Sequence, residues 1–296
     1  MTQDAPTAVG PLLAHLCDDA AIFPPGLKPL EQAVPDHLGH GRSGHAGYVG
    51  PFLLSAAALQ KAGPVVAGLA AGAIDLALTV PDETALPDAL ARVDELPAFR
   101  LVAVEVPLST GIDPAVGIAA IQAAVAGRDI EVFVEIPRDD RRPDAIAAVQ
   151  AAGYQAKFRT GGIRAELYPD EAELADGIIA VVSRGLPFKA TAGLHHAVRN
   201  TDPDRGFEQH GFLNILQAVS VVLDGGDREA VIDALAERDG AALAGRLAEL
   251  DDDQARAVRR SFRSFGTCSI SEPIDELTEL GLVDGTPTSH QGAHRS

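Results

Sequence analysis

Short apolar runs recur along the chain at intervals that suit one strand followed by one helix. Eight such runs have β-like character, and several of them end in proline, which cannot donate to a sheet ladder and so marks the end of a strand. The predicted strands are 20–25, 47–54, 74–81, 99–107, 130–137, 154–160, 186–193 and 261–270.

Alanine-rich segments with helical periodicity lie between most of these runs. Several begin with Asp or Pro-Asp and end on Gly, which are the residues preferred at the first turn and just past the last turn of a helix. Strands that alternate with helices of this length indicate βαβ units and a parallel sheet. Eight units predict a closed (βα)₈ TIM-type barrel rather than an open doubly wound sheet.

One interval is much longer than the others. About seventy residues separate the seventh and eighth predicted strands, and they have helical character without a strand pattern. We interpret 197–260 as a helical insertion within a single barrel domain, 1–284, and 285–296 as a disordered tail. The insertion suits a lid or a contact in a homo-oligomer; if 200–226 covers the mouth, Arg205 or His210 should lie near the strand ends.

Composition narrows the class of protein. Apolar residues make up 46% of the chain, and the formal net charge of −18 disfavours binding to nucleic acid or to an anionic membrane. The N-terminus lacks the features of a signal peptide, no apolar run is long enough to span a bilayer, and two cysteines make no disulfide framework. We therefore expect a cytoplasmic protein that acts on a small molecule and needs no cofactor.

Two lysines stand out because lysine is rare in this chain. Only four of the 24 basic residues are lysine, and Lys157 and Lys189 each lie among alternating apolar residues on neighbouring predicted strands. Two amines in one partly desolvated pocket disfavour each other's protonation, so one of them can become a nucleophile that forms a Schiff base. The alternative is that each lysine lies outside the barrel and pairs with a helix carboxylate.

The sequence around these lysines resembles the deoxyribose-phosphate aldolase family. The segments "KFRTGG" and "KATAGL" are similar to its K-x-x-T-G motif on strand six and its K-[AP]-x-G-G motif on strand seven. Glu135 in "FVEIP" matches the family's strand-five glutamate, and "FRSFGTCSI" matches its strand-eight glycine-serine loop. The resemblance covers strands four to eight.

The resemblance implies a class I aldolase barrel that acts on a small carbonyl compound, with or without a phosphate group. Lys157 takes the Schiff-base position, Lys189 lowers its pKa, and Glu105 or Glu135 serves as acid and base. The substrate-binding residues implied by the motifs are Arg159, Thr160, Gly161, Gly162, Thr191, Gly193, His195, Gly266, Thr267 and Ser269. The last three correspond to the phosphate loop, where backbone N–H groups at a helix start suit an anion.

Several positions depart from the family pattern. The strand-four aspartate of the family is nearest to Ala103, and Glu105 points to the same side two positions nearer the mouth. Arg159 replaces a small hydroxyl residue, Ala192 replaces a glycine, and His195 has no counterpart in the family. These departures predict a different substrate.

Other interpretations remain open at this level. A barrel without turnover would bind an anion through Arg159, Lys189 and the strand-eight loop, and a metal-assisted enzyme would use Glu105, Glu135 and a histidine. Asp18 and Asp19 precede the first predicted strand and fit the end of a helix better than a pair of pocket carboxylates. Of His195 and His196, which are adjacent, we expect at most one to face the mouth.

Overall fold

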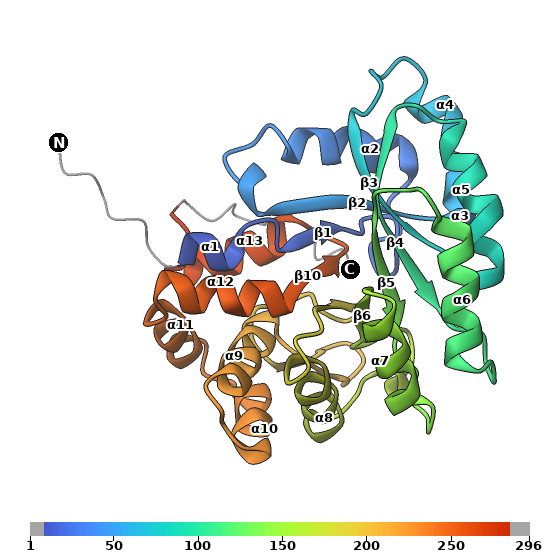
Figure 1. Ribbon diagram of the computed structural model, residues 1–296. Helices are drawn as coiled ribbons and strands as arrows, with labels where there is room; N and C mark the ends of the chain where they lie inside the picture. The colour runs from blue at the N-terminus through green and yellow to red at the C-terminus, as the bar shows by residue number, and fades with distance from the viewer. Residues whose placement is uncertain (1–8, 285–296) are drawn as a thin grey trace.

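Eight parallel strands close into a barrel, and the predicted (βα)₈ fold is confirmed (Figure 1). The computed structural model describes residues 9–284, so the tail predicted at 285–296 lies outside the described residues. The barrel strands are β1 (Cys17–Asp19), β2 (Val49–Ser55), β3 (Ile74–Thr79), β4 (Phe99–Pro107), β5 (Glu131–Glu135), β6 (Gln155–Arg159), β7 (Phe188–Thr191) and β10 (Phe262–Thr267). They follow one another around the barrel in chain order, and β10 closes it against β1.

Helices form the outer layer, as Figure 1 shows. They are α1 (Val9–Leu13), α2 (Leu30–His40), α3 (Ala56–Leu59), α4 (Gly63–Val66), α5 (Leu86–Asp94), α6 (Pro114–Val125), α7 (Arg142–Ala151), α8 (Glu171–Val182), α9 (Phe212–Leu223), α10 (Arg228–Ala236), α11 (Gly240–Ala248), α12 (Asp252–Ser261) and α13 (Ser271–Glu279). Among the described residues, no helix is both long and apolar enough to span a bilayer.

The predicted capping residues perform that role. The side chains of Asp113, Asp170 and Asp227 accept hydrogen bonds from backbone N–H groups in the first turns of α6, α8 and α10. Gly153 follows α7 with a φ of +71°, a left-handed conformation that suits glycine at the end of a helix. Local sequence therefore fixes where these helices begin and end.

Alternation along the strands separates the two cores. On β4, Val104 and Val106 are fully buried against the outer helices, whereas Ala103 belongs to a small apolar cluster inside the barrel together with Phe133. Glu105 lies on the same lumen side as Ala103, as the period of two requires, and is also fully buried. The polar site thus rests on an apolar floor within the lumen.

The first strand lies earlier in the chain than predicted. β1 is Cys17–Asp19, and the range 20–25 forms the turn that follows it. Asp18 pairs in register with Gly266 of β10, which directs its side chain into the lumen. The expectation that Asp18 belongs to a helix end was wrong. The strand has three residues, two of which are aspartates, so it lacks the apolar alternation by which strands are predicted.

The insertion contains strands as well as helices. β8 (Asn200–Thr201) and β9 (Glu208–Gln209) pair as a two-stranded antiparallel hairpin before α9, so the prediction that this segment has no strands of its own was wrong. Helices α9 to α12 then follow, and α9 packs against α8, α10, α11 and α12 as part of the outer layer.

Candidate active site

Four of the predicted residues meet in the barrel lumen, on neighbouring strands. Lys157 on β6 is the register partner of both Glu135 on β5 and Lys189 on β7, and Glu105 projects from β4. Both lysines face the interior, so the interpretation that they lie outside the barrel is excluded. The side chains of Lys157, Lys189 and Glu105 are 5%, 1% and 0% exposed, respectively.

A carboxylate lies between the two amines. Glu105 contacts Lys157 Nζ through Oε2 at 2.9 Å and Lys189 Nζ through Oε1 at 2.5 Å. The like-charge repulsion between amines on which the sequence interpretation relied is therefore offset by the charge of Glu105. Lys189 holds this carboxylate in place rather than facing Lys157 directly.

Asp18 adds a further carboxylate to this group of charged side chains, and the sequence analysis did not count it among the site residues. Its Oδ2 accepts hydrogen bonds from Lys189 Nζ and, at 2.7 Å, from Ser264 Oγ. On the other side, Glu135 lies 3.2 Å from Lys157 Nζ and 3.1 Å from the Nε of Arg159. Acidic and basic groups thus alternate across the lumen. In order along the lumen they are Asp18, Lys189, Glu105, Lys157, Glu135 and Arg159.

Burial and pairing shift the pKa values within this row in different directions. Burial alone would raise the pKa of Glu105, but the charges of Lys157 and Lys189 outweigh it and lower the value to about 2. Burial would likewise lower the pKa of Lys189, yet Asp18 and Glu105 raise it. Asp18 has one cationic neighbour in this row, and its burial raises its pKa. Asp18 is therefore the carboxylate of the row that is best suited to hold a proton.

The two lysines differ in how their amines are held. Lys189 Nζ donates well-formed hydrogen bonds to Asp18 and Glu105. Lys157 Nζ is within ion-pair distance of Glu105 Oε2 and Glu135 Oε2, but the angles are not those of a hydrogen bond, and both oxygens are buried without a hydrogen-bond partner among the described residues. These oxygens are paired with the Lys157 amine by charge, and a catalytic role is one explanation for a buried oxygen without a directed hydrogen bond.

Lys157 lies on the floor of a cavity of about 580 Å³ at the C-terminal ends of the strands. In a (βα)₈ barrel this end carries the active site. The cavity is lined by apolar residues, which include Phe23, Leu53 and Ile163, and by polar ones. A hollow of about 850 Å³ on the outer surface involves Arg138 and Glu173, which form an ion pair with each other.

Lys189 does not line this cavity. It borders a separate space of about 460 Å³ at the other end of the lumen, together with Asp18 and Ser264. The anion clamp expected from Arg159, Lys189 and the strand-eight loop is therefore not assembled, because Lys189 lies behind Glu105 as seen from the mouth.

Some predicted substrate-binding residues line the mouth cavity and others do not. Those that line it are Arg159, Gly162, Thr191, Gly193, His195 and Gly266. Thr160 and Gly161 instead join β6 to β7: the Thr160 hydroxyl donates to the carbonyl oxygen of Ala192 at 2.6 Å, and a Cβ on Gly161 would lie 2.7 Å from the Cα of Gly193.

The expected phosphate loop is only partly directed into the cavity. Thr267 is fully buried and its hydroxyl donates to the carbonyl oxygen of Ser269 at 2.9 Å. Ser269 faces a neighbouring pocket beside Asp19 and His40. Of the three residues assigned to this loop, Gly266 alone lines the mouth.

The adjacent histidines point apart, as predicted. His195 lines the cavity, and burial lowers its pKa. His196 contacts Glu276 at 2.5 Å through Nδ1, and this hydrogen bond raises its pKa. Cys268 lies 3.5 Å from the Nδ1 of His195, but burial raises the pKa of its thiol to about 11.

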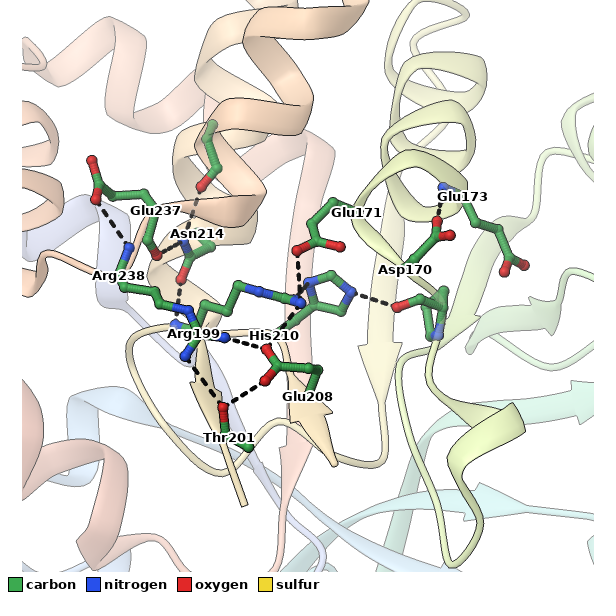
Figure 2. Close-up of polar contacts among 12 residues, drawn as sticks. Asp170, Glu171, Glu173, Arg199, Thr201, Glu208, His210, Asn214, Glu237 and Arg238 are labelled. Atoms are coloured by element: carbon green, nitrogen blue, oxygen red, sulfur yellow. Dashed lines mark hydrogen bonds and ion pairs between the residues drawn. The ribbon is translucent and has the colours of Figure 1, made fainter. Parts of the chain in front are cut away.

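The hairpin of the insertion forms part of the rim. Arg205 and Gln209 line the cavity, so the prediction that Arg205 lies near the strand ends is confirmed. His210 lies deeper: its Nε2 is 2.8 Å from the carbonyl oxygen of Pro169, and burial lowers its pKa to about 4. Figure 2 shows the hairpin anchored by the guanidinium of Arg199, which contacts Glu171 of α8 at 2.6 Å.

The residues proposed as metal ligands are already engaged with cations. Both oxygens of Glu105 face lysine amines, and Glu135 is shared between Lys157 and Arg159. Within residues 9–284, no group of three or more His, Cys, Asp or Glu side chains is arranged to hold a metal ion.

Comparisons with known proteins give no family for this chain. No known family model matches the sequence, and no curated protein is significantly similar to it. Function must therefore be argued from the chemistry of the site.

Proposed function

We propose that this protein is a carbon–carbon lyase of the class I aldolase type, in which Lys157 forms a Schiff base with a small carbonyl compound. The observation that carries the proposal is the position of the Lys157 amine. It lies on the floor of the mouth cavity, between two buried carboxylate oxygens that have no hydrogen bond. Such an amine has both access to a substrate and acceptors for its proton.

The proposed reaction begins with proton transfer from Lys157 to Glu135. The neutral amine then attacks the carbonyl carbon, and the carbonyl oxygen takes a proton to give a carbinolamine. Loss of water yields the protonated imine. Removal of the proton from the hydroxyl group two carbons away then breaks the carbon–carbon bond, which releases a carbonyl product and leaves an enamine. Protonation of the enamine and addition of water release the second product and restore the amine of Lys157. Glu135 suits the acid and base steps because it lies 3.2 Å from the reacting nitrogen. Glu105 lies 2.9 Å from the same nitrogen, and its negative charge stabilises the positive charge that forms there.

Lys189 and Asp18 have supporting roles in this proposal. Lys189 fixes Glu105 by a hydrogen bond of 2.5 Å and keeps it ionised. Asp18 accepts hydrogen bonds from Lys189 and Ser264 and so holds the Lys189 amine against Glu105. The resemblance to deoxyribose-phosphate aldolases supports the Schiff-base role of Lys157, whereas the role proposed here for Lys189 differs from the pKa-lowering role that the resemblance implies.

Borohydride trapping tests the proposal. The protein is incubated with hydroxyacetone and borohydride, and peptide mass spectrometry locates the adduct. We expect a reduced adduct on Lys157 and its loss in Lys157→Arg, because a guanidinium stays protonated and forms no imine. Lys61, which is exposed, supplies the matched control: Lys61→Arg should trap as the parent does. An adduct that maps to another residue, or no adduct with any carbonyl compound tested, would refute the proposal.

A further inference from the structure

Arg159 lies directly above Lys157 in the lumen. Both residues belong to β6 and point to the same side, because they are two positions apart, which separates their Cα atoms by roughly 7 Å. Their side chains hold opposite oxygens of one carboxylate: Lys157 Nζ is 3.2 Å from Glu135 Oε2, and Arg159 Nε is 3.1 Å from Glu135 Oε1. Glu135 thereby fixes the guanidinium beside the amine.

The outer edge of this guanidinium is unused. Nε donates a hydrogen bond to Glu135, whereas the two terminal nitrogens make no hydrogen bond with the described residues. The side chain is 36% exposed and lines the mouth cavity. Arg138 on the outer surface differs, since Nε and both terminal nitrogens bond to Glu173 and to the carbonyl oxygen of Glu166.

The free edge suits a carboxylate. Two parallel N–H groups of a guanidinium match the two oxygens of a carboxylate in a bidentate pair, which is why arginine is preferred for this recognition. Thr191, the register partner of Arg159, lines the same cavity. Its hydroxyl group makes no hydrogen bond within residues 9–284 and is available to a ligand. Leu53, on β2 across the barrel from β6, also lines the cavity and suits a short carbon chain.

We propose that the substrate of this site is a 2-oxo acid, whose carboxylate is bound by Arg159 while Lys157 attacks the adjacent carbonyl carbon. This inference depends on the proposed Schiff-base function and specifies its substrate class. The Lys157 amine and the Arg159 guanidinium flank a single carboxylate, that of Glu135. A substrate that places its carboxylate on Arg159 and its carbonyl carbon at Lys157 therefore carries these two groups next to each other. Arg159 acts here as a substrate-binding residue.

The test compares pyruvate with acetone, which replaces the carboxylate by a methyl group. Borohydride trapping on Lys157 is measured as a function of concentration for both compounds. We expect the half-saturating concentration of pyruvate to be roughly tenfold to hundredfold lower than that of acetone, the effect of a charge-assisted bidentate pair. In Arg159→Gln this preference should disappear, as judged by the ratio of the two half-saturating concentrations, and Arg164→Gln, an exposed control on the following loop, should keep it.

The outcomes separate this inference from the proposed function. Acetone trapping without a preference for pyruvate, or a preference that survives in Arg159→Gln, would overturn the 2-oxo acid assignment and leave the Schiff base in place. If Arg159→Gln also loses acetone trapping, the guanidinium positions Glu135 and Lys157 instead of binding a carboxylate, and the assignment falls. A stronger, Arg159-dependent preference for glycolaldehyde phosphate would assign the anion to a phosphate. If neither compound traps in the parent, the Schiff-base function itself fails.

Discussion

Lys157 and Lys189 occupy the same level of adjacent strands, yet they belong to opposite ends of the barrel lumen. Lys157 faces a cavity of about 580 Å³ at the mouth, and Lys189 borders a separate space of about 460 Å³ at the other end. Lys189 donates hydrogen bonds to two carboxylates, and Lys157 makes ion pairs without a well-formed hydrogen bond. Glu105 divides one environment from the other.

This difference shows how one pair of lysines can divide two tasks. A lysine that donates hydrogen bonds to two carboxylates within the lumen stabilises them and is not free to react. A lysine with incomplete bonding next to a cavity keeps its amine accessible and has proton acceptors nearby. Reactivity and stability should therefore separate when each lysine is changed alone.

The largest effect is expected from Lys189→Met. It leaves Asp18 and Glu105 buried with one cation fewer, and breaking a buried pair in this way costs about 3–5 kcal/mol. Lys157→Met should cost about 1–2 kcal/mol, because Glu105 retains Lys189 and Glu135 retains Arg159. Urea unfolding of both variants at pH 7 measures the two free energies. Equal losses of stability would show that the two environments do not differ as described.

An intermediate effect on stability is expected from Glu105→Gln, and this effect should depend on pH. Because the pKa of Glu105 is lowered to about 2 from an ordinary 4.5, its ionised form stabilises the folded protein fully above pH 4.5. This contribution is lost as the pH falls from 4.5 towards 2, by up to about 1.4 kcal/mol per pH unit. The difference in unfolding free energy between the parent and Glu105→Gln should accordingly be constant from pH 7 to 5 and narrow below pH 4.5. A difference that widens on acidification would contradict the assigned charge state.

The smallest effects on stability are expected from removing one hydroxyl group at each end of the barrel lumen. Ser264 Oγ donates to buried Asp18 at 2.7 Å, so Ser264→Ala should cost about 1–3 kcal/mol. Thr191 lines the mouth cavity and its hydroxyl has no partner among the described residues, so Thr191→Val should change stability by no more than about 0.5 kcal/mol. Thermal unfolding compares them, and a larger loss for Thr191→Val would reverse the comparison.

The barrel and most of the site residues could be predicted from the sequence because the patterns that indicate them are local. Strands β3 to β7 have clear apolar alternation and end near the predicted residues, and that alternation also placed Lys157, Lys189 and Glu105 inside. The capping aspartates and terminal glycines are local signals of the same kind.

The errors arise where position depends on distant partners. β1 has three residues, two of them aspartates, and Asp18 is held inside by Lys189, which is 171 positions away in the chain. β8 and β9 have two residues each and show no alternation. The placement of both lysines inside the barrel on neighbouring strands was predicted correctly, but the carboxylate between their amines depends on how far the Glu105 side chain reaches across the lumen.

Site-resolved reductive methylation tests the central claim, that Lys157 and not Lys189 carries the accessible amine. The folded protein is treated with formaldehyde and cyanoborohydride, and labelling at each lysine is followed by peptide mass spectrometry, with exposed Lys61 as the internal standard. We predict that Lys157 is labelled in the folded protein and that Lys189, whose pKa its two carboxylates raise, is labelled only after unfolding in denaturant. Labelling of Lys189 in the folded protein at a rate equal to or above that of Lys157 would contradict the account.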